Sequence, residues 1–219
     1  PIEHAGQSVA DKILAIREKM ASERATVHII ASLDDVAWTL NLRGSDVKCN
    51  PVFLSYIVLT MQECFLFVDK DKVSNETENI IHKSGVGVRP YNQFFEHIAN
   101  LNDETILLAP TTNQAVFEAV KMRNEIIEQP VPGNLMKAVK NEAEEQGFKK
   151  VMLRDGVAMV KFLHWLTQTV GKEAMDEYSI GEKLHEFRAE GKNFVGSSFD
   201  SIVGYKANGA IMHYSAKSE

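Results

Sequence analysis

The feature that most restricts the fold of this chain is the alternation of short apolar runs with amphipathic stretches over its first 130 residues. The runs at 26–31, 56–59 and 64–68 have the length and composition of buried strands. Only a few polar residues separate the last two runs, as in an antiparallel hairpin. Stretches with helical spacing lie between the others. This pattern predicts an α/β fold, in which a mixed sheet is flanked by helices.

Capping residues mark where the first helices begin. Ser8 is followed by Asp11 at the spacing of a capping box, before apolar positions with helical periodicity. Ser32 precedes Asp34 and Asp35 at the start of a second, short helix, which carries Trp38. Beyond the hairpin we expect helices at about 74–84, 91–100 and 113–122, and strands at about 86–89, 105–109 and 125–127.

The pattern changes after the Val-Pro-Gly at 131–133. Residues 134–190 contain no run typical of a strand but show strong helical periodicity, with breaks expected at Gly147, Gly171 and Gly181. An Asn-Gly turn at 208–209 followed by an apolar run predicts a hairpin within 200–215. We therefore predict two domains, residues 1–146 and residues 147–219, with one helix crossing a boundary near 133–148.

Composition and charge exclude several function classes. The chain of 219 residues has a net charge of -6 and no basic run longer than a pair such as Lys149-Lys150, which argues against a nucleic-acid partner. Its longest apolar runs are far too short to span a membrane, and its first residues do not resemble a signal peptide. Cysteines at positions 49 and 64 fit neither a disulfide framework nor a zinc knuckle, so we expect a reducing, cytoplasmic location.

Motifs that would carry chemistry are weak when they are judged from the residues alone. Asp34, Asp35, Asp46 and Asp69 are a conceivable two-metal cluster, but the first two lie in the first turn of a helix, where they stabilise its dipole. Gly85-Val-Gly87 lacks the third glycine of a dinucleotide fingerprint. The histidines without ligand spacing are interpreted as structural or exposed: His28, His82, His97, His164 and His185.

Three strings in order along the chain are more specific. Residues 33–56, LDDVAWTLNLRGSDVKCNPVFLSY, resemble the second domain of the three-domain Xaa-Pro aminopeptidases (aminopeptidase P). Residues 136–166, MKAVKNEAEEQGFKKVMLRDGVAMVKFLHWL, look like the passage of the same family into its catalytic domain. Residues 198–214, SFDSIVGYKANGAIMHY, resemble the family segment that leads to a histidine beside the active site, here His213.

The resemblance implies a creatinase/prolidase N-terminal-like, ribonuclease-H-like domain followed by the helical beginning of a truncated pita-bread α+β domain. It implies a parent metallopeptidase that removes the N-terminal residue from peptides with proline in second position, and that is a homodimer. His213 would bind substrate by donating a hydrogen bond to the peptide or its tetrahedral intermediate. The ligands of two divalent metal ions, expected to be manganese, would lie downstream, so the chain itself would bind no cofactor and be inactive.

Alternatives stay open beside this interpretation. Arg43-Gly44 is either a helix C-cap, with Gly44 left-handed and Arg43 neutralising the helix end, or Arg43 has a domain-contact or substrate role. Trp38 and Trp165 are interpreted as core residues, and His213 on its residues alone as structural. The alternative function is a non-catalytic binding or oligomerisation module built on an inactive pita-bread scaffold. Because apolar residues of the last segment would lack sheet partners, we expect residues 196–219 to self-associate, swap or be disordered.

Overall fold

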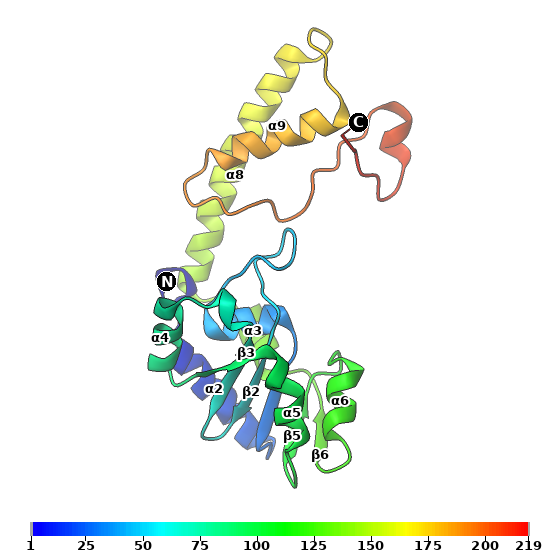
Figure 1. Cartoon of the computed structure of the whole chain (residues 1–219). Coiled ribbons are helices and arrows are strands. Elements are labelled where there is room, and N and C mark those ends of the chain that lie inside the picture. Colours follow the sequence, from blue (N-terminus) through cyan, green and yellow to red (C-terminus); the bar gives the residue numbers. More distant parts are fainter. Residues whose placement is uncertain (1, 219) are drawn as a thin grey trace. The chain divides into compact units, whose positions relative to one another are not determined.

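The computed structural model describes residues 2–218. The chain divides into two compact units, which we call unit 1, residues 1–144, and unit 2, residues 145–219 (Figure 1). Unit 1 contains the sheet and the helices that cover it, and unit 2 is made of helices and irregular segments.

Unit 1 is built on a six-stranded sheet with the order β4-β3-β2-β1-β5-β6. β2 pairs antiparallel with β1 and β3, whereas the β3–β4, β1–β5 and β5–β6 pairs are parallel. The mixed sheet and the β2–β3 hairpin predicted from the sequence are therefore confirmed. The strands are β1 (Val27–Ile30), β2 (Ser55–Thr60), β3 (Cys64–Val68), β4 (Gly87–Pro90), β5 (Thr105–Leu108) and β6 (Glu125–Glu128).

Helices cover both faces of this sheet. Side chains from α2 (Val9–Ser22), α3 (Leu33–Leu40) and α4 (Asn75–Lys83) pack on one face, together with Met136 of α7 (Pro132–Ala138). α5 (Phe94–Ala99) and α6 (Gln114–Val120) pack on the other face. The strands alternate accordingly, since Val27 and Ile29 belong to the second core and Ile30 to the first. Unit 1 therefore has two hydrophobic cores that share one sheet.

The helix starts of unit 1 follow the predicted caps. The Ser8 hydroxyl accepts a hydrogen bond from the Asp11 amide at the start of α2, and Ser32 does the same for Asp35 at α3. Short elements complete the unit: α1 (Ile2–Ala5) and the 3-10 turns η1 (Lys70–Lys72) and η2 (Tyr91–Gln93). Both N-cap positions are therefore confirmed, since each requires only residues close in sequence. The Asp11 carboxylate accepts from the Ser8 hydroxyl, so only the N-cap half of the predicted capping box is confirmed.

The helices of unit 2 are longer than the sequence suggested. α8 (Glu142–Thr169) begins in unit 1 and runs through Gly147, and α9 (Glu177–Ala189) contains Gly181, so the breaks predicted at these two glycines are wrong. A glycine inside a helix costs about 1 kcal/mol relative to alanine, which 28 residues of helical hydrogen bonding tolerate. A Cβ on Gly181 would lie 3.3 Å from the Ser201 Cβ, so glycine there permits close packing. Gly171, with φ +77°, does follow the end of α8.

The hairpin predicted within 200–215 is also wrong. Asn208 and Gly209 lie in a 3-10 turn, η3 (Lys206–Ala210), and residues 190–218 form no strand. The physical reason is that a strand needs a neighbour with free backbone groups, and the described part of unit 2 contains no strand with which this segment pairs.

Candidate functional site

The segment that carries His213 follows α9 and includes η3. His213 is exposed and has a left-handed backbone with φ 56°, and Lys206, at the start of η3, has φ 51°. Residues other than glycine are uncommon in this conformation, although asparagine, aspartate and histidine adopt it several times more often than the rest. The segment therefore has a left-handed residue near each of its ends, and the second of these is His213 itself.

One carboxylate, that of Glu177, holds both ends of this segment. The Tyr205 amide donates to its Oε1 atom and the Tyr214 hydroxyl donates to its Oε2 atom. Between them, the Asn208 Nδ2 atom lies 3.2 Å from Oε1 and 3.0 Å from Oε2, and 3.1 Å from the Tyr214 hydroxyl. Sequence reasoning missed Glu177, because nothing local distinguishes it from other acidic residues in a first helical turn.

The pKa values of the two strongest partners shift in opposite directions. The hydrogen bond from Tyr214, followed by that from the Tyr205 amide, lowers the pKa of Glu177 below its usual value. The same bond to Glu177 raises the pKa of the Tyr214 hydroxyl. Both shifts favour a neutral phenol that donates to an ionised carboxylate.

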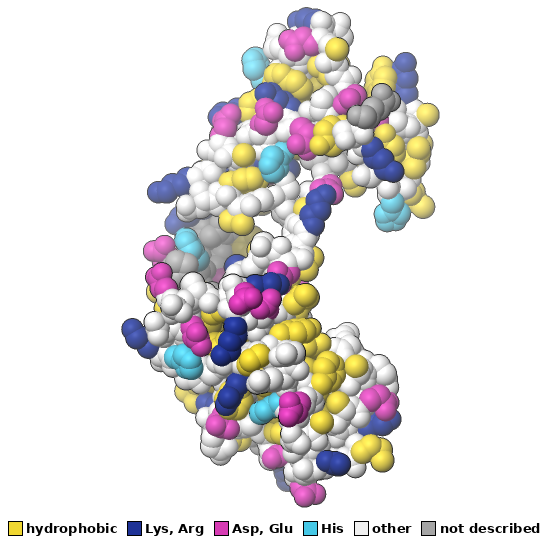
Figure 2. Space-filling view, in the orientation of Figure 1, with side chains coloured by type: hydrophobic (Ala, Val, Ile, Leu, Met, Phe, Trp, Pro, Cys, Tyr) yellow, Lys and Arg dark blue, Asp and Glu magenta, His cyan; other side chains and the backbone are white. Residues whose placement is uncertain are grey.

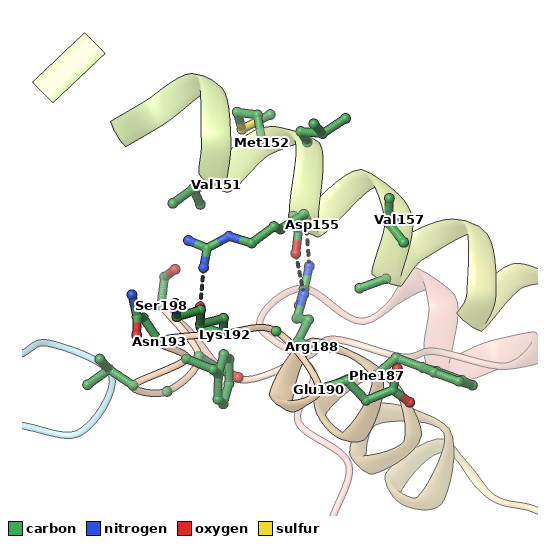
Figure 3. A pocket seen from close by; sticks show the side chains of 18 of the residues that line it. Val151, Met152, Asp155, Val157, Phe187, Arg188, Glu190, Lys192, Asn193 and Ser198 are labelled. Carbon is green, nitrogen blue, oxygen red and sulfur yellow. Dashed lines mark hydrogen bonds and ion pairs between the residues drawn. The ribbon is translucent and has the colours of Figure 1, made fainter. Parts of the chain in front are cut away.

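Unit 2 also contains a cavity of about 740 Å³, formed by α8, the end of α9 and residues 191–199 (Figure 3). The Arg188 side chain crosses it from α9 and donates to both carboxylate oxygens of Asp155 on α8, at 2.6 and 3.3 Å. Arg154 donates to the Lys192 carbonyl. Val151, Val157 and Phe187 add apolar walls. The cavity therefore combines apolar surface with two arginine side chains, Arg154 and Arg188, that already donate to acceptors of unit 2.

Arg43 lies in unit 1 at the end of α3. Its Nη1 atom donates to the Leu42 and Ala37 carbonyls, at 2.8 and 3.2 Å, so it satisfies acceptors at the helix C-terminus as the C-cap interpretation requires. The left-handed residue of this cap is Asn41, with φ 53°, and not Gly44. A Cβ on Gly44 would lie 2.6 Å from the Phe53 Cβ, so glycine is required there by close approach and not by its backbone angle.

The two tryptophans differ in their surroundings. Trp38 is buried on α3, and the Lys12 Nζ atom lies 4.0 Å from the centre of its ring. Trp165 on α8 is half-buried and its ring centre lies 6.0 Å from that of Phe162. The core interpretation therefore describes Trp38 well and Trp165 only in part.

The four aspartates considered as a metal cluster are used in other ways. Asp35 is buried and pairs with Lys137 at 2.6 Å, and Asp46 pairs with Lys72 at 2.8 Å. Asp69 accepts from an amide at the start of η1, and Asp34 accepts from Asn50. Within residues 2–218, no three His, Cys, Asp or Glu side chains are grouped so that they could hold a metal ion. The described residues thus do not fit a dinuclear metal centre.

Comparison with known families identifies both parts of the chain. Residues 1–144 match the model of the Creatinase/Prolidase N-terminal domain, and residues 146–219 match that of Metallopeptidase family M24. The chain belongs to the Creatinase/Prolidase N-terminal domain family. The fold expected from the resemblance, a creatinase-type domain followed by the start of an M24 domain, is therefore confirmed.

Several Xaa-Pro aminopeptidases are similar in sequence to this chain over almost its whole length. Xaa-Pro aminopeptidase 1 of Dictyostelium discoideum is 39% identical over 95% of the chain, and Xaa-Pro aminopeptidase ApepP of Drosophila melanogaster is 35% identical over 100% of it. The chain spans only 34% and 36% of those two proteins. It therefore corresponds to about a third of the curated relatives that it matches.

Solved structures agree with this assignment. The X-prolyl aminopeptidase of Caenorhabditis elegans, described as a cytosolic enzyme with a di-nuclear active site, superposes with a TM-score of 0.86 and 30% identity over 92% of this chain and 34% of its own. The prolidase of Pyrococcus horikoshii, with a TM-score of 0.54 and 14% identity over 82% of this chain and 48% of its own, shares the fold. Among the residues described here, no helix combines the length and apolar character that a membrane span needs.

Proposed function

We propose that the chain is part of a metal-dependent Xaa-Pro aminopeptidase, which releases the N-terminal residue from peptides with proline in second position. The observation that carries this proposal is that relatives of that name match between 95% and 100% of the chain. Unit 1 then corresponds to the creatinase-type domain and unit 2 to the beginning of the catalytic domain. A cytoplasmic location, as described for the protein from Caenorhabditis elegans, and a homodimeric parent belong to the same proposal.

In this proposal His213 is the residue of the chain that touches substrate. Its imidazole is exposed at the end of an anchored segment, so an N–H group is available to donate to the carbonyl oxygen of the bond before proline. Such a donor stabilises the negative charge that develops on this oxygen during hydrolysis. Arg43 already donates to two carbonyls at the end of α3, and a domain-contact or substrate role for it remains a prediction.

The metal ions of the parent, expected to be a manganese pair, need ligands that the described residues do not bring together. We therefore propose that the 219-residue chain alone neither holds these ions nor cleaves peptides. The alternative is a non-catalytic binding or oligomerisation module. It is favoured by the exposed apolar side chains of Phe199, Ile202 and Met212, which suit contact with a partner.

One set of assays separates these functions. The 219-residue chain and the protein encoded by the complete reading frame are each incubated with manganese and an Arg-Pro-Pro peptide. Release of arginine only by the longer protein, abolished by a chelator, is the expected result. Metal-dependent cleavage by the 219-residue chain would show that the active site has been misplaced. A longer protein that binds no metal and cleaves nothing would favour the binding module.

The His213→Ala variant tests the proposed role of the histidine. In the longer protein we expect turnover to fall by about 10² to 10³, the usual cost of one oxyanion-stabilising donor, with the metal content unchanged. His164→Ala is the matched control, because His164 is exposed on α8. A fully active His213→Ala protein would contradict the role.

A further inference from the structure

We propose that Glu177 is a positioning residue that fixes the backbone and the imidazole of His213. The inference deepens the proposed function, because it concerns the same histidine and rests on its contact with substrate. Glu177 does not reach His213 itself; it holds Tyr214, the next residue in the chain. The effect of Glu177 would therefore pass through the backbone of the segment.

Three donors converge on the one carboxylate of Glu177. The amide of Tyr205, the side-chain amide of Asn208 and the hydroxyl of Tyr214 all donate to Glu177. These donors come from the beginning, the middle and the end of a ten-residue segment, 205–214. The Glu177 side chain thus joins the two ends of this segment and closes it into a loop. Hydrogen bonds to an ionised carboxylate are about twice as strong as bonds between neutral groups.

A left-handed residue lies beside each of the two tyrosines that contact Glu177. Lys206, with φ 51°, follows Tyr205, and His213, with φ 56°, precedes Tyr214. Left-handed conformations of such residues persist only where neighbouring contacts determine them, and they are frequent at functional sites. Because the flanking tyrosines are both held by Glu177, its carboxylate is the group that maintains the unusual angle at His213.

The helix that carries the Glu177 carboxylate is fixed independently of the segment. Glu177 is the first residue of α9, a helix of 13 residues. A capping box fixes this helix start independently: the Asp176 carboxylate accepts from the Ser179 amide at 2.6 Å, and the Ser179 hydroxyl accepts from the Asp176 amide at 2.9 Å. The positive end of the helix also favours an ionised Glu177. Removal of the Glu177 carboxylate should therefore release the segment and leave α9 in place.

The substitution that tests the inference is Glu177→Gln. Glutamine has nearly the same size, but it offers one acceptor oxygen and turns an NH₂ group towards donors. Glu182→Gln is the control, since Glu182 is an exposed residue of the same helix and its replacement removes the same charge. Tyr214→Phe removes one donor and keeps the ring, so its effect should be smaller than that of Glu177→Gln.

Kinetics of the longer protein provide the first measurement. We expect Glu177→Gln to lower kcat by roughly 10-fold to 100-fold, in the range lost with a charge-assisted hydrogen bond, while KM changes by less than about threefold. Metal content should stay at the wild-type level, and Glu182→Gln should have wild-type kcat. Combining Glu177→Gln with His213→Ala should add little to the loss caused by His213→Ala alone, because the two residues act as a unit.

The second measurement does not depend on catalysis. In the longer protein, labelled selectively at histidine and tyrosine, nuclear magnetic resonance reports the left-handed backbone of His213 through its strong intraresidue amide–Hα Overhauser effect, and also the titration of the Tyr214 ring. Glu177→Gln should weaken this Overhauser effect and bring the pKa of Tyr214 down towards its ordinary value, whereas Glu182→Gln should change neither. An unchanged Overhauser effect together with unchanged kcat would overturn the inference.

The two proposals can fail separately. If the wild-type longer protein does not release residues from Xaa-Pro peptides, the proposed function fails, and the resonance measurements still decide whether Glu177 sets the His213 backbone. If wild type is active and His213→Ala is slow, but Glu177→Gln equals its control in both measurements, only the positioning role fails.

Discussion

The two units of this chain bury apolar surface to very different extents. Unit 1 packs apolar side chains on both faces of its sheet, and many of them are fully inaccessible, among them Ile16, Ile57, Leu66 and Ile106. In unit 2, the buried apolar side chains among the described residues are Ala158 and Phe162. Its exposed large apolar residues include Phe148, Met152, Leu153, Val160, Val195, Phe199, Ile202 and Met212. Figure 2 shows hydrophobic side chains, in yellow, at the surface of the molecule.

This difference shows which unit is self-sufficient. Burial of apolar surface is the main favourable term in folding, at about 25 cal/mol for each Å² removed from water. Unit 1 has that term on both sides of its sheet, whereas unit 2 relies on helical hydrogen bonds and on pairs such as Arg188–Asp155. We infer that unit 2 gains its full stability only when its exposed apolar side chains are covered by another surface.

The largest expected effect that tests this comparison is in amide hydrogen exchange. Amides of β1 and β2 should exchange on the order of 10³ times more slowly than those of residues 196–218, because the former open only with unit 1 as a whole. Exchange measured by mass spectrometry on the isolated chain, with light scattering for self-association, checks this. A clean monomer with strong protection across 196–218 would break the comparison.

A pair of leucine substitutions provides the next test. Leu66 on β3 is fully buried, and Leu66→Ala should cost about 2 to 5 kcal/mol in free energy of unfolding through lost burial and the cavity left behind. Leu163 on α8 is 51% exposed, so Leu163→Ala should change stability by less than about 0.5 kcal/mol. Urea unfolding of both variants measures the difference. Equal costs would mean that α8 is as well packed as the sheet.

Lys12 makes the stability of unit 1 depend on pH. Its side chain is buried on α2, where Nζ donates to the Trp38 carbonyl at 2.8 Å and to Asn41 at 2.7 Å. Burial lowers the pKa of Lys12 from 10.5 to about 8. The folded chain therefore binds this proton less tightly than the unfolded chain does. Below the folded pKa, burial of the ammonium group lowers the free energy of unfolding by its full amount, and this loss is relieved as the pH rises from about 8 to about 10.5.

The prediction compares wild type with Lys12→Met over this range. The free energy of unfolding of wild type, relative to the variant, should rise by about 2 kcal/mol from about pH 7 to about pH 10. A difference for Lys12→Met that stays flat with pH would argue that its ammonium group is well solvated.

The smallest expected effect concerns the pair that joins α8 and α9. Arg188 and Asp155 have side chains that are 24% and 38% exposed, so solvent screens their attraction. A double-mutant cycle with Arg188→Ala and Asp155→Ala should give a coupling of about 0.5 to 1 kcal/mol, at the upper end for exposed pairs because the contact is bidentate. A coupling several times larger would show that unit 2 is more firmly assembled than its exposure suggests.

The helix caps and the first hairpin, which depend on residues close in sequence, were predicted well, whereas the local signals at 208–209, Gly147 and Gly181 wrongly predicted a hairpin and two helix breaks. Ser8 and Ser32 predicted the starts of the helices that they cap. The two apolar runs on either side of 60–63 predicted the β2–β3 hairpin. The family strings also point to His213, whose role rests on that resemblance and stays a prediction. In all these cases the information lies within a short window of the sequence.

Features that depend on distant residues were missed. Asp35 was interpreted as a helix-dipole residue, yet it is buried and pairs with Lys137, which lies 102 positions away. Gly44 was given a left-handed role, whereas Phe53 on a later segment requires its small size. Glu177 accepts hydrogen bonds from donors that lie 28 to 37 positions further along the chain. No local pattern records such contacts, because they are set by how the elements pack.

The position of β1 in the sheet has a consequence for the order in which the chain folds. β1 pairs with β2 soon after it in sequence, but its other neighbour is β5, where His28 lies opposite Leu107. Closing so long a loop is entropically costly and slow, so we infer that β1, β2 and β3 assemble first and β5 and β6 join last. Substitutions in β2 should then slow folding, whereas those in β6 should mainly accelerate unfolding. On the ribosome, β1 would keep one edge open until β5 has emerged, and during that interval the nascent chain is most in need of a chaperone.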